Sequence, residues 1–178
     1  MENTSRLPQP LISFDAANIA LECVGGKGIN LAKLTQAGFT IPPGFIIPTS
    51  SYLDFIESNQ LADQIQSLLT GLDHSSPTDL EAVSTQIRQV FNQGRIPDSL
   101  VRALKQGWGF LDDKPLAVRS SATAEDLPDM SFAGQQDTFL NVTMLDQLLS
   151  TVIKCWSSLW TARAIGYRHR NNIPDSDV

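Results

Sequence analysis

A glycine-rich turn near the N-terminus has residue types that can bind a phosphate group. Residues 24–30 read Val-Gly-Gly-Lys-Gly-Ile-Asn, and a helix is predicted from about Lys27 to Ala37. Glycines let backbone N–H groups approach an anion closely, and the N-terminus of a helix adds partial positive charge. The Lys27 side chain can reach a phosphate oxygen. The spacing of a Walker A loop is absent, so a plain glycine turn with an exposed lysine is an equally good interpretation.

A second candidate is an arginine at the end of a predicted strand. Residues 116–119 read Leu-Ala-Val-Arg, and Ser-Ser-Ala-Thr-Ala-Glu-Asp follows. The planar guanidinium of Arg119 suits phosphate oxygens, and hydroxyl groups can donate to a phosphate or cap the next turn. The alternative is that Arg119 pairs with Glu125 or Asp126 while the serines only cap. The residues alone favour this alternative slightly.

The third candidate is a long polar segment between two predicted strands. Residues 131–138 read Ser-Phe-Ala-Gly-Gln-Gln-Asp-Thr and end a loop that starts near residue 120. Loops of this length in compact domains are usually functional or disordered. Gly134 can place its N–H against a ligand because no side chain intervenes. We therefore predict a mobile flap over residues 122–136; the alternative is a tight hairpin with Phe132 in the core.

Aromatic and basic residues alternate over residues 156–170. Trp156 and Trp160 are four positions apart, so a packed helix face is more plausible than a nucleic-acid surface. The basic residues, among them Arg168, are then expected to form a solvated face or a docking edge. His169 is expected at the surface.

Cysteine and histidine are too scarce for most other chemistry. The two cysteines and two histidines do not make a disulfide framework or a compact metal site. His74 lies in a polar turn and is assigned no role. Cys23 is interpreted as a small buried residue. The nucleophile motif of α/β-hydrolases is absent.

Composition narrows the class of protein further. The chain has 178 residues, a net charge of −6 and 42% hydrophobic residues, which is typical of a globular protein. An acidic chain is a poor nucleic-acid binder. We find neither a run of apolar residues that could span a membrane nor the pattern of a signal peptide, so we expect a cytoplasmic protein.

The elements that must position these residues suggest an α+β fold. Ser76 starts the best-marked helix, because Pro77 follows it and Asp79 completes a capping pattern. Thr49 and Thr143 are the predicted caps of two other helices. The remaining predictions are strands near residues 11–14, 44–47, 116–118 and 137–142, and helices over 61–69 and from Pro97. This order lacks strict alternation of strand and helix, which indicates a helix-rich fold with a small, mainly antiparallel sheet.

Four motifs in this order resemble one known family. They are residues 24–28, residues 34–44 (Leu-Thr-Gln-Ala-Gly-Phe-Thr-Ile-Pro-Pro-Gly), residues 116–126 and residues 131–138. They are similar to the N-terminal ATP-binding domain shared by phosphoenolpyruvate synthase, pyruvate phosphate dikinase and rifampicin phosphotransferase. Residues 155–160 and 163–164 extend the match, which covers about residues 15–173.

The resemblance implies the first lobe of an ATP-grasp nucleotide-binding domain. In the family, the matching lysine and arginine, here Lys27 and Arg119, bind ATP phosphates. The matching glycine and threonine, here Gly134 and Thr138, lie on a loop that closes over the nucleotide. Residues 1–14 are then a loose N-terminal segment and residues 15–178 a partial ATP-binding domain. Lys27 and Arg119 should lie on the same side of one cleft.

The resemblance also implies parts that this chain does not contain. In the family, a second ATP-grasp lobe supplies the acidic ligand of Mg²⁺, and a histidine on a swivelling domain carries the phosphate to its acceptor. We therefore expect no catalytic residue and no metal ligand within these 178 residues, and no activity from them alone. Phosphoenolpyruvate synthase, which converts pyruvate, ATP and water to phosphoenolpyruvate, AMP and phosphate, is the first expectation. Pyruvate phosphate dikinase, rifampicin phosphotransferase and a non-enzymatic nucleotide- or partner-binding module are the alternatives.

Overall fold

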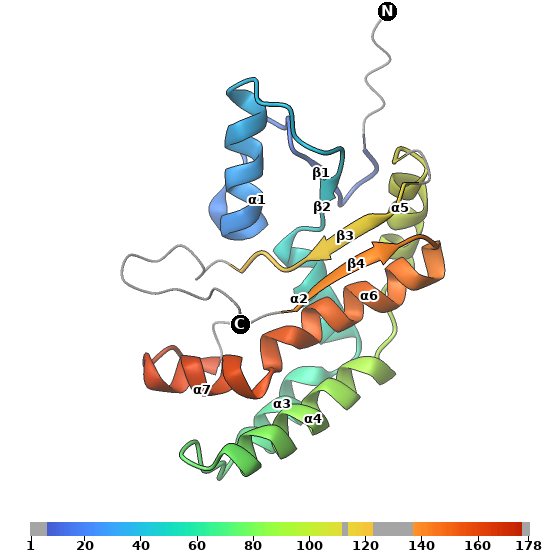
Figure 1. The fold of residues 1–178 in the computed structure, drawn as a ribbon. Coiled ribbons are helices and arrows are strands. Elements are labelled where there is room, and N and C mark those ends of the chain that lie inside the picture. The colour runs from blue at the N-terminus through green and yellow to red at the C-terminus, as the bar shows by residue number, and fades with distance from the viewer. Residues whose placement is uncertain (1–6, 112–113, 123–136, 176–178) are drawn as a thin grey trace, which may run out of the picture.

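The protein is helix-rich, with two small antiparallel sheets of two strands each (Figure 1). A computed structural model describes residues 7–111, 114–122 and 137–175. In chain order the elements are β1 Ile12–Ser13, α1 Leu21–Gln36, β2 Phe45–Ile46, α2 Thr49–Ser58, α3 Leu61–Leu69, α4 Pro77–Gln93, α5 Asp98–Trp108, β3 Leu116–Arg119, β4 Thr138–Val142, α6 Leu145–Ser157, the short 3-10 helix η2 Ser158–Trp160 and α7 Ala162–Arg170. The predicted α+β class is confirmed.

The first sheet ties the N-terminal segment to the rest of the fold. β1 pairs with β2 in antiparallel register, with Ile12 opposite Ile46. Leu11 is 3% exposed and packs on Gly107 of α5, where an added Cβ would lie 2.6 Å from the Leu11 Cδ1. The expectation that residues 1–14 are loose is therefore wrong for residues 11–13. Burial of an apolar side chain and strand pairing hold them in place.

The core lies between α2 and α4 on one side and α6 and α7 on the other. Phe55 and Phe91 are completely buried, and their rings lie 5.8 Å apart. Trp156 packs on Phe55 with a ring separation of 5.1 Å and on Tyr52 at 6.0 Å. Trp160 is 3% exposed, so the predicted packed aromatic face is confirmed.

Helix starts follow local sequence signals in part. The Asp79 N–H donates to Ser76 Oγ over 3.3 Å, which confirms the predicted cap of α4. Thr49, by contrast, is the first residue of α2 rather than its cap, and its hydroxyl donates to the Glu22 carbonyl of α1 over 2.7 Å. The Thr49 hydroxyl thus bonds to a carbonyl of another helix instead of capping its own.

The predicted cap of α6 is also wrong. Met144 is the N-cap residue, and the Thr143 N–H donates to Gln147 Oε1 over 2.9 Å.

The C-terminal helical region is divided into two helices, α6 and α7. η2 interrupts it, and Thr161 starts α7 by accepting a hydrogen bond from the Ala164 N–H over 3.1 Å.

The second sheet packs on α6 with one face and leaves the other open. β3 and β4 are antiparallel, with Arg119 opposite Thr138, and they lie beside α6 in Figure 1. Val142, the last residue of β4, is 1% exposed, whereas Leu140 of the same strand is 66% exposed. In the part of the chain that the structure describes, no helix combines the length and apolar character that crossing a membrane requires.

Candidate functional site

The glycine turn is a kink inside α1 rather than a loop before it. α1 starts at Leu21, six residues before the predicted start, and Gly25 interrupts it with φ 67° and ψ 177°. Residues with a side chain do not adopt this conformation without strain. Gly25 thus separates one helical turn from the remainder of α1, which carries Lys27 near its start.

Residues 121–122, which follow β3, hold this turn. The Gly26 N–H donates to the Ala122 carbonyl over 3.1 Å, and the Gly28 N–H donates to Ser121 Oγ over 2.9 Å. The Ser121 hydroxyl in turn donates to the Val24 carbonyl over 2.7 Å. Two N–H groups that we expected to face an anion are therefore used within the chain. Ser121, predicted to donate to a phosphate or to cap the next turn, instead bonds to α1, far from it in sequence.

These contacts bring three of the four predicted site residues into one region. Arg119 ends β3 two residues before Ser121, and Thr138 is its register partner on β4. Both are exposed on the open face of the sheet. Lys27 is half-buried on the turn that residues 121–122 hold. The fourth residue, Gly134, lies outside the described residues.

Cys155 of α6 is a buried thiol with a raised pKa. Burial raises the pKa of this thiol to about 12, and the Asp137 carboxylate raises it further while the Lys27 ammonium lowers it. Asp137 directly precedes Thr138 in the chain. A thiol with so high a pKa is a poor nucleophile at neutral pH.

Asp137 forms an ion pair with an arginine of α4. Arg88 Nη2 of α4 lies 3.1 Å from Asp137 Oδ2, and the two side chains are 37% and 30% exposed. Arg88 is not among the residues predicted from the sequence, and no local pattern marks it, because 49 positions separate it from its partner. The predicted alternative for Arg119, an ion pair with Glu125 or Asp126, falls on residues outside the described ranges, as do residues 123–136 of the predicted flap.

Arg168 is buried, which corrects the expectation of a solvated basic face. The residue is 3% exposed, and its Cζ lies 4.7 Å from the centre of the Trp160 ring. Its Nε is 2.7 Å from Asp175 Oδ1, and its Nη1 donates to the Leu159 carbonyl over 2.6 Å. Stacking on the Trp160 ring and the hydrogen bonds of Nε and Nη1 support this burial, whereas Nη2 is buried without a hydrogen-bond partner among the described residues.

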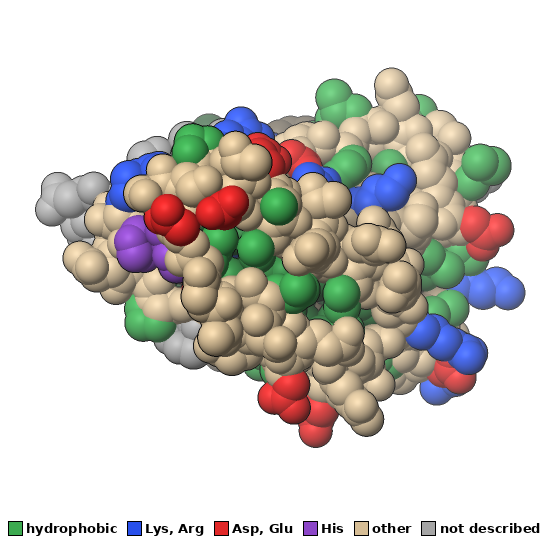
Figure 2. All heavy atoms as spheres, turned by 90° about the horizontal axis from the view of Figure 1, so that it is seen from below, with side chains coloured by type: hydrophobic (Ala, Val, Ile, Leu, Met, Phe, Trp, Pro, Cys, Tyr) green, Lys and Arg blue, Asp and Glu red, His purple; other side chains and the backbone are tan. Residues whose placement is uncertain are grey.

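Two other expectations concern small polar residues. Cys23 is exposed rather than buried, because Val24 next to it carries the buried face of this turn. His169 is exposed as predicted, and its ring stacks on that of His74 with centroids 3.9 Å apart. The histidine side chains gather at one edge of the face in Figure 2, beside acidic side chains. The stacked rings face each other, and the described residues contain no cluster of three potential metal ligands.

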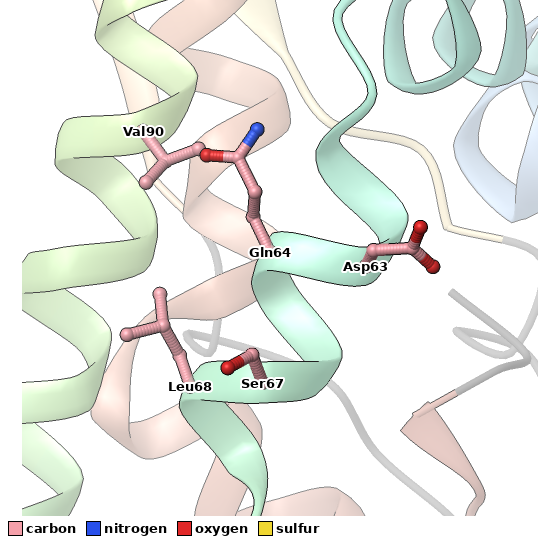
Figure 3. A pocket seen from close by; sticks show the side chains of 5 residues that line it. All are labelled: Asp63, Gln64, Ser67, Leu68 and Val90. Carbon is pink, nitrogen blue, oxygen red and sulfur yellow. The ribbon is translucent and has the colours of Figure 1, made fainter.

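Two surface hollows lie away from this region. The first lies between α3 and α4, where Gln64 extends toward Val90 while Asp63 points away (Figure 3). The second lies between α2, α3 and the C-terminal segment, and Trp160 and Asp175 are among the residues that line it. None of the three placed site residues lines either hollow. These two hollows therefore do not mark the region of Lys27, Arg119 and Thr138.

Comparison with known proteins gives one family. The family model described as "Pyruvate phosphate dikinase, AMP/ATP-binding domain" matches residues 21–178. A probable phosphoenolpyruvate synthase of Methanothermobacter thermautotrophicus is 42% identical over 160 residues, which are 86% of this chain and 23% of the relative. A phosphoenolpyruvate synthase of Deinococcus radiodurans is 40% identical over 163 residues, 89% of this chain and 21% of the relative.

A differently named relative is equally similar. The rifampicin phosphotransferase of Bacillus subtilis is 42% identical over 160 residues, which are 89% of this chain and 18% of the relative. The chain thus spans about a fifth of the length of these curated relatives.

Proposed function

Because this chain belongs to the family of pyruvate phosphate dikinase AMP/ATP-binding domains, we propose that it binds the phosphates of ATP through Lys27, Arg119 and Thr138. We assign residues 15–178 to the first lobe of an ATP-grasp domain, with Gly134 on the loop that closes over the nucleotide. The observation that carries the proposal is the attachment of the Lys27 turn to residues 121–122, directly after the strand that ends in Arg119.

The proposed site binds phosphate by side-chain charge more than by backbone amides. The N–H groups of Gly26 and Gly28 donate within the chain, so they serve to fix the position of Lys27. Arg119 offers a planar guanidinium and Thr138 a hydroxyl on neighbouring strands. Two cationic side chains suit a triphosphate, because charge-assisted hydrogen bonds to phosphate oxygens are stronger than neutral ones.

The proposed reaction is that of phosphoenolpyruvate synthase. Phosphate passes from ATP to a histidine on another domain and then to pyruvate. Mg²⁺ is the proposed metal, and it would neutralise charge on the phosphates. We place its ligands in the second lobe, as the resemblance to the family implies. The second lobe and the phosphohistidine domain are the proposed partners of this lobe, and the cytoplasm is its proposed location.

Transfer to rifampicin is a second candidate reaction. The rifampicin phosphotransferase of Bacillus subtilis favours this candidate, because its identity to this chain, 42%, equals that of the Methanothermobacter thermautotrophicus synthase. The residues of the proposed site contact only ATP, so they do not select between the two acceptors.

Nucleotide binding tests the proposed site. We expect Lys27→Ala and Arg119→Ala each to weaken ATP binding by the full-length natural polypeptide about tenfold to a hundredfold, as for a lost hydrogen bond to a charged group. Lys33→Ala is the matched control for Lys27, because Lys33 is exposed further along the same helix. Equal affinities for Lys27→Ala, Lys33→Ala and the unmodified protein, measured by calorimetry, would contradict the site.

Product analysis tests the reaction. Incubation of the same polypeptide with ATP and pyruvate should yield phosphoenolpyruvate and AMP, whereas ATP and rifampicin should leave the antibiotic unchanged. Phosphorylated rifampicin without phosphoenolpyruvate would select the second candidate. Absence of both products, from a protein that binds ATP, would refute both reactions and leave nucleotide binding intact.

A further inference from the structure

The hollow between α2, α3 and Asp175, here called the α2–α3 groove, is lined mostly by apolar side chains. Tyr52, Ile65 and Trp160 are buried residues of its lining, and Leu53 of α2 lines it with 57% of its surface exposed. Its volume of about 390 Å³ leaves room for several side chains. An exposed leucine alone needs no explanation, but one that lines an apolar hollow belongs to a surface that another segment can cover.

The last described residue of the chain lies on this groove. Asp175 is one of the residues that line it. Its carboxylate lies 2.7 Å from Nε of Arg168, which is 3% exposed. The Ile173 N–H also donates to the Arg168 carbonyl over 3.0 Å. An ion pair with a buried guanidinium and a backbone hydrogen bond therefore hold Asp175 at the groove.

The guanidinium of Arg168 has a donor for which the described residues supply no acceptor. Its Nη2 is buried and has no hydrogen-bond partner among them. Arg168 contacts two residues that line the groove, since its Cζ lies 4.7 Å from the centre of the Trp160 ring and its Nε pairs with Asp175. A buried donor without an acceptor is costly. Because Asp175 already neutralises the arginine, we expect the missing acceptor to be an uncharged group such as a backbone carbonyl.

We propose that the polypeptide that follows residue 178 in the full-length protein covers the α2–α3 groove, with apolar side chains in the hollow and a backbone carbonyl near Arg168. The length of the relatives favours this occupant, because this chain spans about a fifth of them and the family match extends to residue 178. A segment tethered beside the groove also has a high effective concentration there, so it competes well against any separate molecule. The inference rests on the proposed continuation into a second lobe and does not depend on ATP binding.

The accessibility of introduced cysteines tests whether the groove is covered. In the full-length natural polypeptide, Leu53→Cys and Gln66→Cys should each react with a maleimide at least about tenfold more slowly than Asp54→Cys, because the covering segment must open first. Leu53 and Gln66 line the groove from α2 and α3 and are exposed in this structure. Asp54 is the matched control, because it is exposed on the same helix as Leu53 and is not among the lining residues. Mass spectrometry of the labelled peptides gives the rate at each position, relative to the denatured protein.

Photo-crosslinking tests which segment covers the groove. Replacement of Leu53 by the photoreactive amino acid benzoylphenylalanine should give, on irradiation of the full-length polypeptide, a crosslink to a peptide that follows residue 178. The product should keep the mass of one chain. A product with the mass of two chains would assign the groove to a second copy and overturn the inference, and so would a crosslink to a peptide that precedes residue 178.

The remaining outcomes are equally decisive. Equal labelling of Leu53→Cys, Gln66→Cys and Asp54→Cys would show an open groove, and a natural polypeptide that ends at residue 178 would remove the proposed occupant. Either result would overturn this inference, whereas weaker ATP binding by Lys27→Ala would still support the proposed nucleotide site. If one groove variant does not fold, the other decides, because the two positions lie on different helices.

Discussion

Replacement of Gly25 by alanine should separate the two halves of the proposed site. An ideal Cβ at this position would lie 1.9 Å from the Ser121 carbonyl oxygen and 2.4 Å from its carbonyl carbon. These are backbone atoms, so a change of side-chain rotamer cannot relieve the overlap. The alanine would also have to adopt φ 67° with ψ 177°, a region that is almost restricted to glycine.

The size of the effect follows from what must move. Residues 121–122 would have to withdraw from the turn, and this would break the three hydrogen bonds that join Gly26, Gly28 and Val24 to them. At about 1 kcal/mol each, these bonds account for about 3 kcal/mol. Backbone strain adds about 1–3 kcal/mol. We therefore expect Gly25→Ala to lower the free energy of unfolding by about 4–6 kcal/mol.

Gly71→Ala is a matched control. Gly71 also has a positive φ, 76°, but an added Cβ would meet no atom within 4 Å. Its cost should be the backbone strain alone, about 1–2 kcal/mol. Urea unfolding of the 178-residue chain measures both values, and hydrogen exchange at the amides of Gly26 and Gly28 reports the local effect. These amides should lose protection in Gly25→Ala and keep it in Gly71→Ala.

Two results would refute this reasoning. One is a free energy of unfolding that is equal in the two variants to within about 1 kcal/mol, the usual worth of one hydrogen bond. The other is unchanged protection of the Gly26 and Gly28 amides in a folded Gly25→Ala chain. Either result would mean that the turn and residues 121–122 are not in contact.

Two further predictions concern buried ionisable groups. In the folded chain, the exposed Cys23 thiol should react with a disulfide reagent at pH 8. Cys155 should react only after unfolding, because burial raises the pKa of its thiol to about 12. Two fast-reacting thiols, or one that persists in Cys23→Ser, would contradict this prediction. Burial likewise raises the pKa of Tyr52 to about 12, although the Trp160 N–H bonded to its hydroxyl lowers it in part. In the unfolded chain the phenol ionises near pH 10, whereas in the folded chain it stays neutral up to about pH 12. The contribution of Tyr52 to the free energy of unfolding, about 3 kcal/mol, is therefore complete below pH 10 and is lost as the pH rises to 12. Denaturant titrations over this range should show a shallower loss of stability in Tyr52→Phe than in the unmodified chain.

Local signals in the sequence determined several elements and the residue types of the site. Ser76, Pro77 and Asp79 set the start of α4 within four residues, because a capping hydrogen bond spans only one helical turn. Gly38 ends α1 in the same local manner: its φ is 82°, and its N–H donates to the Thr35 carbonyl. The motifs around Lys27 and Arg119 were likewise readable, since each is continuous in sequence.

The tertiary structure decided how those motifs are used. Ser121 clamps a turn 93 positions earlier in the chain, and Arg88 pairs with an aspartate 49 positions later. Arg168 has the same residue type as its exposed neighbour Arg170, yet it is buried, because Trp160 and Asp175 meet it there. No local pattern marks these partners. Whether a polar group faces water or a protein partner depends on which distant segment packs against it, and that packing forms only when the whole core does.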